Sequence, residues 1–241
     1  MINNNIKASK IDRYADSILL SVAYHMHSDD TLRSVMLAEY YANNIQNENN
    51  NLYDTLFYDK PANKQYLRYW HGSASVVRLM HIFFDIKGIY ITNGILLSLL
   101  AAALFAILIH GKIYSGAVGL FVSLISAGVW YVPLSLEYTW NFIIMFVISI
   151  AASYMAMKDN WKYMGALFMI SGIVTNFFDF LTTETLTLLM PMLIAMCIKW
   201  EKKAPDCKTD LRTASLCTVP LGYWLFRNMG DEMAACISCN G

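Results

Sequence analysis

Charged side chains are scarce in this chain. Asp, Glu, Lys and Arg together make up 15% of the 241 residues, against about 25% in soluble domains. Positive and negative charges cancel, so the basic stripe that is typical of a nucleic-acid binder is absent. We therefore exclude nucleic acid as a partner. Hydrophobic residues make up 56% of the chain, which favours contact with a lipid bilayer instead.

Cysteine is also sparse, with five residues. A structural zinc site takes four protein ligands, whereas the chain contains a single C-x-x-C pair, Cys236 and Cys239, in a short tail. The spacing of the cysteines therefore predicts no structural zinc centre.

Long apolar runs dominate the second half of the chain. A helix needs about 20 apolar residues to cross the hydrocarbon core of a bilayer. Runs near that length follow one another at 90–109, 114–134, 138–157, 161–178 and 181–198. We therefore predict an all-α fold, with a polytopic bundle of five transmembrane helices within residues 89–199.

The charges between these runs alternate in sign along the chain. Lys112, Lys158 and Lys199 occupy or flank some of the connections, and Glu137 and Asp179 occupy the others. Cytoplasmic loops of membrane proteins carry an excess of basic residues. We therefore expect the lysine-bearing connections in the cytoplasm and the acidic ones on the outer side of the cell membrane.

The same orientation makes residues 1–88 an extracytoplasmic helical region. Within it, residues 64–87 interleave aromatic and aliphatic side chains with Arg and His, a pattern typical of an amphipathic helix on a membrane surface. The first ten residues are polar and form no signal peptide. We therefore expect the chain to be a fragment of a longer protein whose first span lies upstream.

Three segments are expected after the fifth run. Residues 200–213 are predicted to be a cytoplasmic linker. Residues 214–229 are apolar but short and contain Pro220, so they are predicted to be a partial sixth membrane segment. Residues 230–241 lack any periodicity and are predicted to be a disordered tail.

Acids at the outer ends of the runs are the first candidates for function, because ionisable groups at membrane depth are costly and usually paired or functional. Asp179 lies among aromatic residues where two runs meet, with Glu184 close behind it. Alternatively, Asp179 is only an acid in a loop, and Glu184 or the nearby threonines cap a helix. Glu137 lies in an aromatic turn with Pro133. Alternatively, this turn is only part of an aromatic belt at the membrane interface.

Asp12 and Asp16 form a second cluster. Residues four positions apart share one face of a helix, and two carboxylates so placed can hold a divalent cation such as Mg²⁺ or Mn²⁺. One of them can instead act as a general base. The alternative is a surface pair that is neutralised by Arg13.

Arg68, His71 and Arg78 form a third cluster, within the predicted interfacial helix. The planar fork of Arg suits phosphate oxygens, and His can act as an acid or a base near neutral pH. The alternative is interfacial anchoring by Arg, Tyr and Trp.

Four motifs in this order make residues 10–200 similar to a family of uncharacterised polytopic membrane proteins of Gram-positive gut bacteria. The motifs are Asp12-Arg-Tyr-Ala-Asp16, Arg68-Tyr-Trp-His-Gly72, Leu134-Ser-Leu-Glu-Tyr138 and Phe178-Asp-Phe-Leu-Thr-Thr-Glu184. More loosely, the layout resembles the GT-C class of glycosyltransferases, which use lipid-linked sugars and carry more spans than the five predicted here.

The looser resemblance implies a transferase that acts on a polyprenyl-phosphate sugar at the outer membrane face. Asp12 or Asp16 would be the catalytic base or hold the metal, and Asp179 would be a third catalytic acid. The other residues of the expected site would bind the substrate and stabilise the leaving phosphate; they are Arg68, His71, Arg78, Glu137 and Glu184.

Two other functions stay open. A non-catalytic membrane component, or a pseudoenzyme fragment, would carry the same clusters without chemistry. A transporter would place ionisable residues near the middle of its spans, and the predicted spans carry almost none there.

Overall fold

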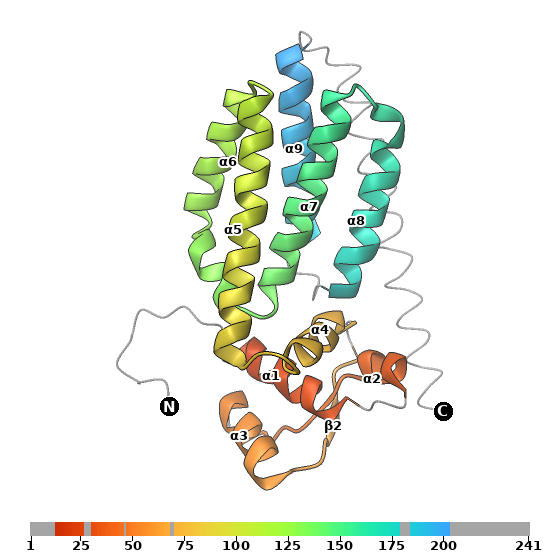
Figure 1. Cartoon of the computed structure of the whole chain (residues 1–241). Helices are drawn as coiled ribbons and strands as arrows, with labels where there is room; N and C mark the ends of the chain where they lie inside the picture. The colour runs from red at the N-terminus through yellow and green to blue at the C-terminus, as the bar shows by residue number, and fades with distance from the viewer. Residues whose placement is uncertain (1–12, 27–29, 46, 68–69, 179–183, 203–241) are drawn as a thin grey trace.

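The computed structural model describes residues 13–26, 30–45, 47–67, 70–178 and 184–202. Their fold is mostly helical, as expected, and forms two layers (Figure 1). A bundle of long helices, α5 to α9, stands on a smaller N-terminal layer, which we call the cap and which comprises α1 to α4 with two short strands. The predicted linker, sixth segment and tail lie outside the described residues, apart from the start of the linker, which continues the last helix.

The cap is built from short helices, two of which have side-chain caps. Its elements are α1 (Arg13–His25), α2 (Thr31–Leu37), β1 (Glu39–Tyr40), α3 (Glu48–Tyr58), β2 (Lys64–Gln65) and α4 (Gly72–Met80). The two strands pair antiparallel, with Glu39 opposite Gln65. The Asp30 carboxylate accepts a hydrogen bond from the backbone N–H of Arg33 and thereby caps α2. The Asn47 side chain caps α3 in the same way.

The bundle places one helix in the centre and the others around it. Its elements are α5 (Ile86–His110), α6 (Tyr114–Ser126), η1 (Val129–Leu134), α7 (Tyr138–Met157), η2 (Trp161–Tyr163), α8 (Met164–Phe178) and α9 (Glu184–Lys202). Helix α7 packs against α5, α8 and α9. Leu104, Phe146 and Phe168 are fully buried between these helices, so the bundle has a core of its own.

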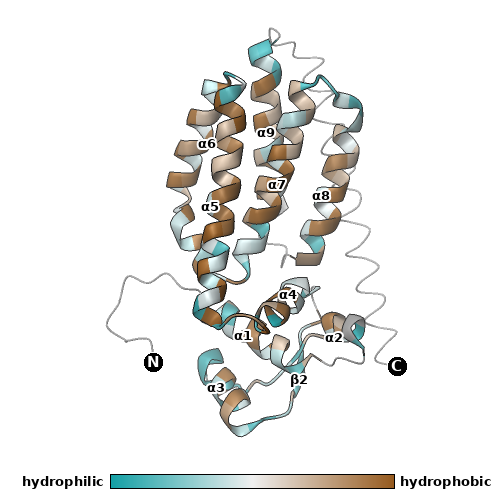
Figure 2. Ribbon diagram, viewed as in Figure 1, coloured by the Kyte–Doolittle hydropathy of each residue, from teal (hydrophilic) through white to brown (hydrophobic). Residues whose placement is uncertain are grey.

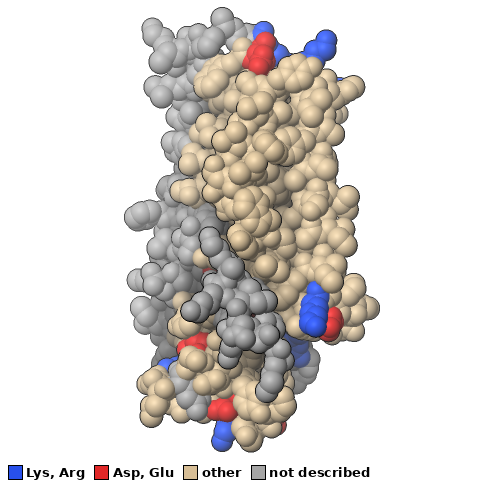
Figure 3. Space-filling view, turned by 90° about the vertical axis from the view of Figure 1, so that its left-hand side faces the viewer, with Lys and Arg blue, Asp and Glu red and all other residues tan. Residues whose placement is uncertain are grey.

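Two of the helices, α5 and α7, are long and apolar enough to cross a membrane by length and composition, and α6 is a shorter apolar helix. Figure 2 shows hydrophobic residues along the bundle helices and hydrophilic residues concentrated at their ends and in the cap. On the face in Figure 3, Lys, Arg, Asp and Glu lie towards the two ends of the molecule. The described surface over the middle of the bundle carries none on this face.

Four of the five expected membrane helices have different bounds in the structure, and only 138–157 matches its helix, α7. The largest differences are in the second run and in the expected interfacial helix. The run at 114–134 does not form one helix, because Gly128 adopts a left-handed φ of 63° that ends α6 and starts the short helix η1, with Pro133 inside it. Among the described residues of the amphipathic stretch at 64–87, one short helix spans Gly72–Met80, and residues 86–87 already belong to α5. The Asp85 carboxylate then caps the start of α5 through the backbone N–H of Gly88, at 2.7 Å.

Candidate functional site

Asp16 lies in the first turn of α1, at the junction between the cap and the bundle. Its side chain is 4% exposed. One carboxylate oxygen accepts a 2.8 Å hydrogen bond from the backbone N–H of Leu136, and the other accepts a 2.9 Å bond from the hydroxyl of Tyr90. Hydrogen bonds to an ionised acceptor are among the strongest in proteins. Asp16 therefore ties α1 to α5 and to the connection that enters α7.

Glu137 directly follows Leu136, so the junction holds a second carboxylate, which is also buried. Polar residues surround it along the chain. The Thr139 hydroxyl donates to the carbonyls of Ser135 and Val132, which steadies the turn before α7. Asn93, on α5, is 1% exposed, and no hydrogen bond to its amide nitrogen is found among the described residues. Asp16 and Glu137, from distant parts of the sequence, are thus both buried near the bond between Asp16 and Leu136.

His71 lies at the start of α4 and is fully buried in the cap. Its Nε2 atom is 3.2 Å from the carbonyl oxygen of Tyr66, and a carbonyl only accepts, so Nε2 carries the hydrogen. Burial lowers the pKa of His71 from 6.5 to about 4. The imidazole is therefore neutral at pH 7 and closed to solvent in this conformation.

Arg78 is exposed on α4, and its guanidinium donates to the backbone carbonyl of Met26, just after α1 ends. Asp16 lies in the first turn of the same helix. At about 1.5 Å of rise per residue, Asp16 and Met26 are about 15 Å apart along the axis of α1. The structure thus brings Asp16 and Glu137 to one corner and leaves Arg78 at the other end of α1.

The remaining predicted site residues are not described. Asp12, Arg68 and Asp179 lie outside the described residues, and Glu184 begins α9 without a described side chain. Among the described residues, no group of three or more His, Cys, Asp or Glu side chains is arranged to hold a metal ion. The predicted divalent-cation site at Asp12 and Asp16 stays a prediction.

A cavity of about 520 Å³ lies between the end of α6, η1 and the first turns of α7, and neither Asp16 nor Glu137 lines it. Its wall includes the aromatic side chains of Trp130, Tyr131, Tyr138 and Phe142 and the polar residues Ser126 and Ser135. The hydrogen bond from Leu136 to Asp16 starts one residue after Ser135. This cavity therefore borders the junction, and its volume is within the range of small-molecule sites.

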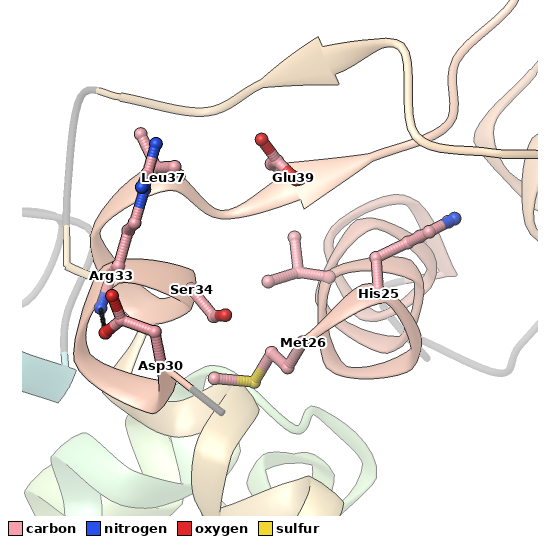
Figure 4. Close-up of a pocket in the computed structure, with 8 residues that line it drawn as sticks. His25, Met26, Asp30, Arg33, Ser34, Leu37 and Glu39 are labelled. Carbon is pink, nitrogen blue, oxygen red and sulfur yellow. Dashed lines mark hydrogen bonds between the residues drawn. The ribbon is translucent and has the colours of Figure 1, made fainter. Parts of the chain in front are cut away.

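Sequence reasoning missed a charged cavity of about 370 Å³ between α1, α2 and β1 (Figure 4). Asp30, Arg33 and Glu39 line it together with His25. The sequence offers one signal for it, the Asp that precedes Thr31 as a helix cap, but the contribution of Glu39 depends on the bend after α2. The structure makes that bend at Ala38, whose φ of 43° is left-handed.

Comparison of the chain with protein families, with curated proteins and with solved structures returns no match.

Proposed function

We propose that this chain is an integral membrane protein whose bundle lies in the bilayer with the cap at one membrane surface. The observation that carries the proposal is the apolar outer surface of the bundle. On α5, Ile91, Ile95 and Leu99 are 63%, 57% and 63% exposed, and their spacing makes one stripe along the helix. Phe121 and Val122 on α6 are likewise exposed. Soluble monomers rarely expose an apolar surface this extended.

The end of the bundle opposite the cap supports this location. Lys158 lies over the ring of Tyr154, Lys162 over Tyr163 and Lys199 over Trp161, at 5.7, 5.5 and 5.5 Å from the ring centroids. Basic and aromatic side chains together are typical of a membrane–water interface. By the positive-inside rule, this lysine-rich end is the cytoplasmic one, and the cap lies on the outer side.

The activity that we propose is transfer of a sugar from a polyprenyl-phosphate carrier at the capped end of the bundle. The buried Asp16 and Glu137 and a cavity with four aromatic side chains are found at this end, and aromatic faces suit the apolar faces of sugar rings. Asp16 uses both carboxylate oxygens in bonds to Leu136 and Tyr90, so we assign it a positioning role. The role of general base then belongs to Asp12.

The other substrate-binding roles implied by the resemblance stay part of the proposal. Arg68 would bind the phosphate and Asp179 would orient the acceptor, whereas Arg78, at the other end of α1 from Asp16, lies outside this site. His71 is neutral and buried, so its part in this scheme is to fix the start of α4 rather than to carry charge.

A second function, a non-catalytic membrane component, is favoured by a specific observation. The candidate side chains with described bonds use them within the fold: Asp16 on Leu136 and Tyr90, and Arg78 on Met26. In that case the cap is held firmly on the bundle and binds a ligand or a partner without catalysing a reaction.

One experiment separates the two functions. The purified chain is placed in phospholipid vesicles with a polyprenyl-phosphate sugar and an acceptor that carries a free hydroxyl group, and release of polyprenyl phosphate is measured together with transfer of the sugar to that hydroxyl. Asp12→Asn and Asp179→Asn are compared with Asp54→Asn, a change on α3 away from the junction. Loss of a general base costs about 10²- to 10⁴-fold in rate, and Asp54→Asn should cost nothing.

Resistance to alkaline extraction from membranes tests the location independently. A chain that resists extraction and releases no polyprenyl phosphate ends the transferase proposal and leaves the membrane component. A rate that survives both substitutions overturns the roles assigned to Asp12 and Asp179.

A further inference from the structure

A second, apolar cavity of about 500 Å³ lies on the cap, where four helices converge. We call it the cap groove. Its lining residues are Leu20, Ala23 and Tyr24 of α1, Leu52 and Leu56 of α3, Arg78 and His81 at the end of α4, and Ile86 at the start of α5. None of the functions expected from the sequence involves the cap groove.

The lining of the cap groove matches an amphiphile with an anionic head. Its walls are aliphatic and aromatic, and two of its polar members are Arg78, in the last turn of α4, and His81, which directly follows that helix. Arg78 gives one donor to the Met26 carbonyl, and a guanidinium has five N–H donors. A bidentate fork therefore stays available for phosphate oxygens, with the His81 imidazole as a further donor. A free phosphate would leave the apolar walls without a partner.

The position of the groove connects it to the proposed membrane surface. Ile86 is both a wall of the groove and the first residue of α5, whose exposed apolar stripe follows. The turn between α4 and α5 exposes Ile82 and Phe83 by 70% and 74%, and Leu79 is 58% exposed one turn earlier. Apolar surface thus continues from the bundle to the groove, so a lipid chain can enter sideways.

Charges of both signs lie near the groove. The Asp59 carboxylate accepts a 2.9 Å hydrogen bond from the hydroxyl of Tyr24, which lines the groove. Lys87 is exposed next to Ile86. A second acid, Asp85, is occupied as the cap of α5. A basic group close to an anionic membrane surface contributes about a fivefold gain in affinity.

We propose that the cap groove binds one anionic phospholipid of the surrounding membrane, with an acyl chain between α1 and α3 and the phosphate on Arg78 and His81. This proposal rests on the membrane location of the bundle. An apolar helix of a partner protein is the competing occupant, but it would use only the apolar walls.

The test uses the full chain in vesicles of equal parts phosphatidylcholine and phosphatidylglycerol. After mild detergent extraction, native mass spectrometry counts the lipids that each protein retains. We expect selective retention of phosphatidylglycerol, about fivefold weaker retention in Arg78→Gln, and loss of retention in Ala23→Leu, which fills the groove. Arg33→Gln removes an exposed arginine from α2 and should leave retention unchanged.

A photoreactive residue in place of Leu56, which is 51% exposed, distinguishes the occupants. A cross-link to phosphatidylglycerol supports the proposal, whereas a cross-link to another protein, or equal retention of both lipids by all variants, overturns it. Alkaline extraction of the same membranes distinguishes failure of the proposed membrane location from failure of lipid binding in the cap groove. A chain that stays in the membrane but shows no lipid selectivity overturns the groove alone.

Discussion

Asp16 and Leu136 are joined by a 2.8 Å hydrogen bond although 120 residues separate them in the sequence. The donor is a backbone N–H just before α7, and the acceptor is a carboxylate on the first turn of α1. Because Tyr90 binds the other carboxylate oxygen, one side chain fixes the cap against two parts of the bundle. The orientation of the cap, and of anything it binds, depends on this contact.

Asp16→Ala should therefore loosen the cap. The substitution leaves the buried N–H of Leu136 and the hydroxyl of Tyr90 without their acceptor, and each unsatisfied group costs about 1–3 kcal/mol. We expect a loss of about 3 kcal/mol in the free energy of unfolding, with faster proteolysis of α1 as the direct readout. Asp16→Asn keeps one acceptor oxygen and should cost about half as much.

A double-mutant cycle isolates the bond between Asp16 and Tyr90. Tyr90→Phe alone should cost about 1.5 kcal/mol, and it should cost much less in the Asp16→Ala background, because the acceptor is already gone. Tyr53→Phe, on an exposed face of α3, is the matched control and should change stability by less than about 0.5 kcal/mol. Additive effects of the two junction substitutions would show that the bond contributes nothing.

His71 should make the stability of the cap fall in acid. Its pKa is about 4 in the folded protein and 6.5 without burial, so the unfolded chain binds more protons between these values and stability rises with pH. The contribution is complete above pH 6.5 and is lost as the pH falls towards 4. The loss amounts to about 3 kcal/mol.

Urea unfolding of the cap, followed at several pH values, measures this effect. In His71→Gln the titrating group is gone, so the dependence on pH between 6.5 and 4 should flatten even where the variant is less stable overall. His81→Gln removes an exposed histidine and should keep the slope of the parent chain. An equal slope in all three proteins would rule out His71 as the source.

We predict that alanine lowers stability at Gly72 and raises it at Gly119. A Cβ on Gly72 would come within 2.6 Å of the Phe177 carbonyl oxygen, so Gly72→Ala must push α4 away from α8, at a cost of about 1–3 kcal/mol. Nothing lies within 4 Å of a Cβ on Gly119, and alanine favours α6 by about 1 kcal/mol. Thermal unfolding of the two variants should therefore shift in opposite directions.

The helical class could be predicted from the sequence because long apolar runs leave few other structures open. The run at 138–157 coincides with α7, whereas the run at 114–134 is interrupted at Gly128. Apolarity alone does not reveal such a break, because it depends on a backbone conformation that glycine adopts without cost.

The candidate site was less predictable. The sequence singled out Asp16 and Glu137 as acids, but their meeting depends on how α1 docks against the entrance of α7. A pattern within one segment carries no information about that docking. The burial of His71 could not be predicted either, because the aromatic, basic and small residues around it are as typical of a membrane interface as of a buried core.

The last prediction concerns which side of the membrane each end of the bundle faces. The end opposite the cap carries most of the lysines of the bundle, which favours the cytoplasm. Asn160 lies in the connection after α7 at that end, and Asn50 lies on α3 in the cap, both exposed. In a cysteine-free background, an impermeant maleimide should label Asn50→Cys in intact cells and Asn160→Cys only after permeabilisation. The reverse pattern would place the cap in the cytoplasm and remove the outer-face site that the transferase proposal requires.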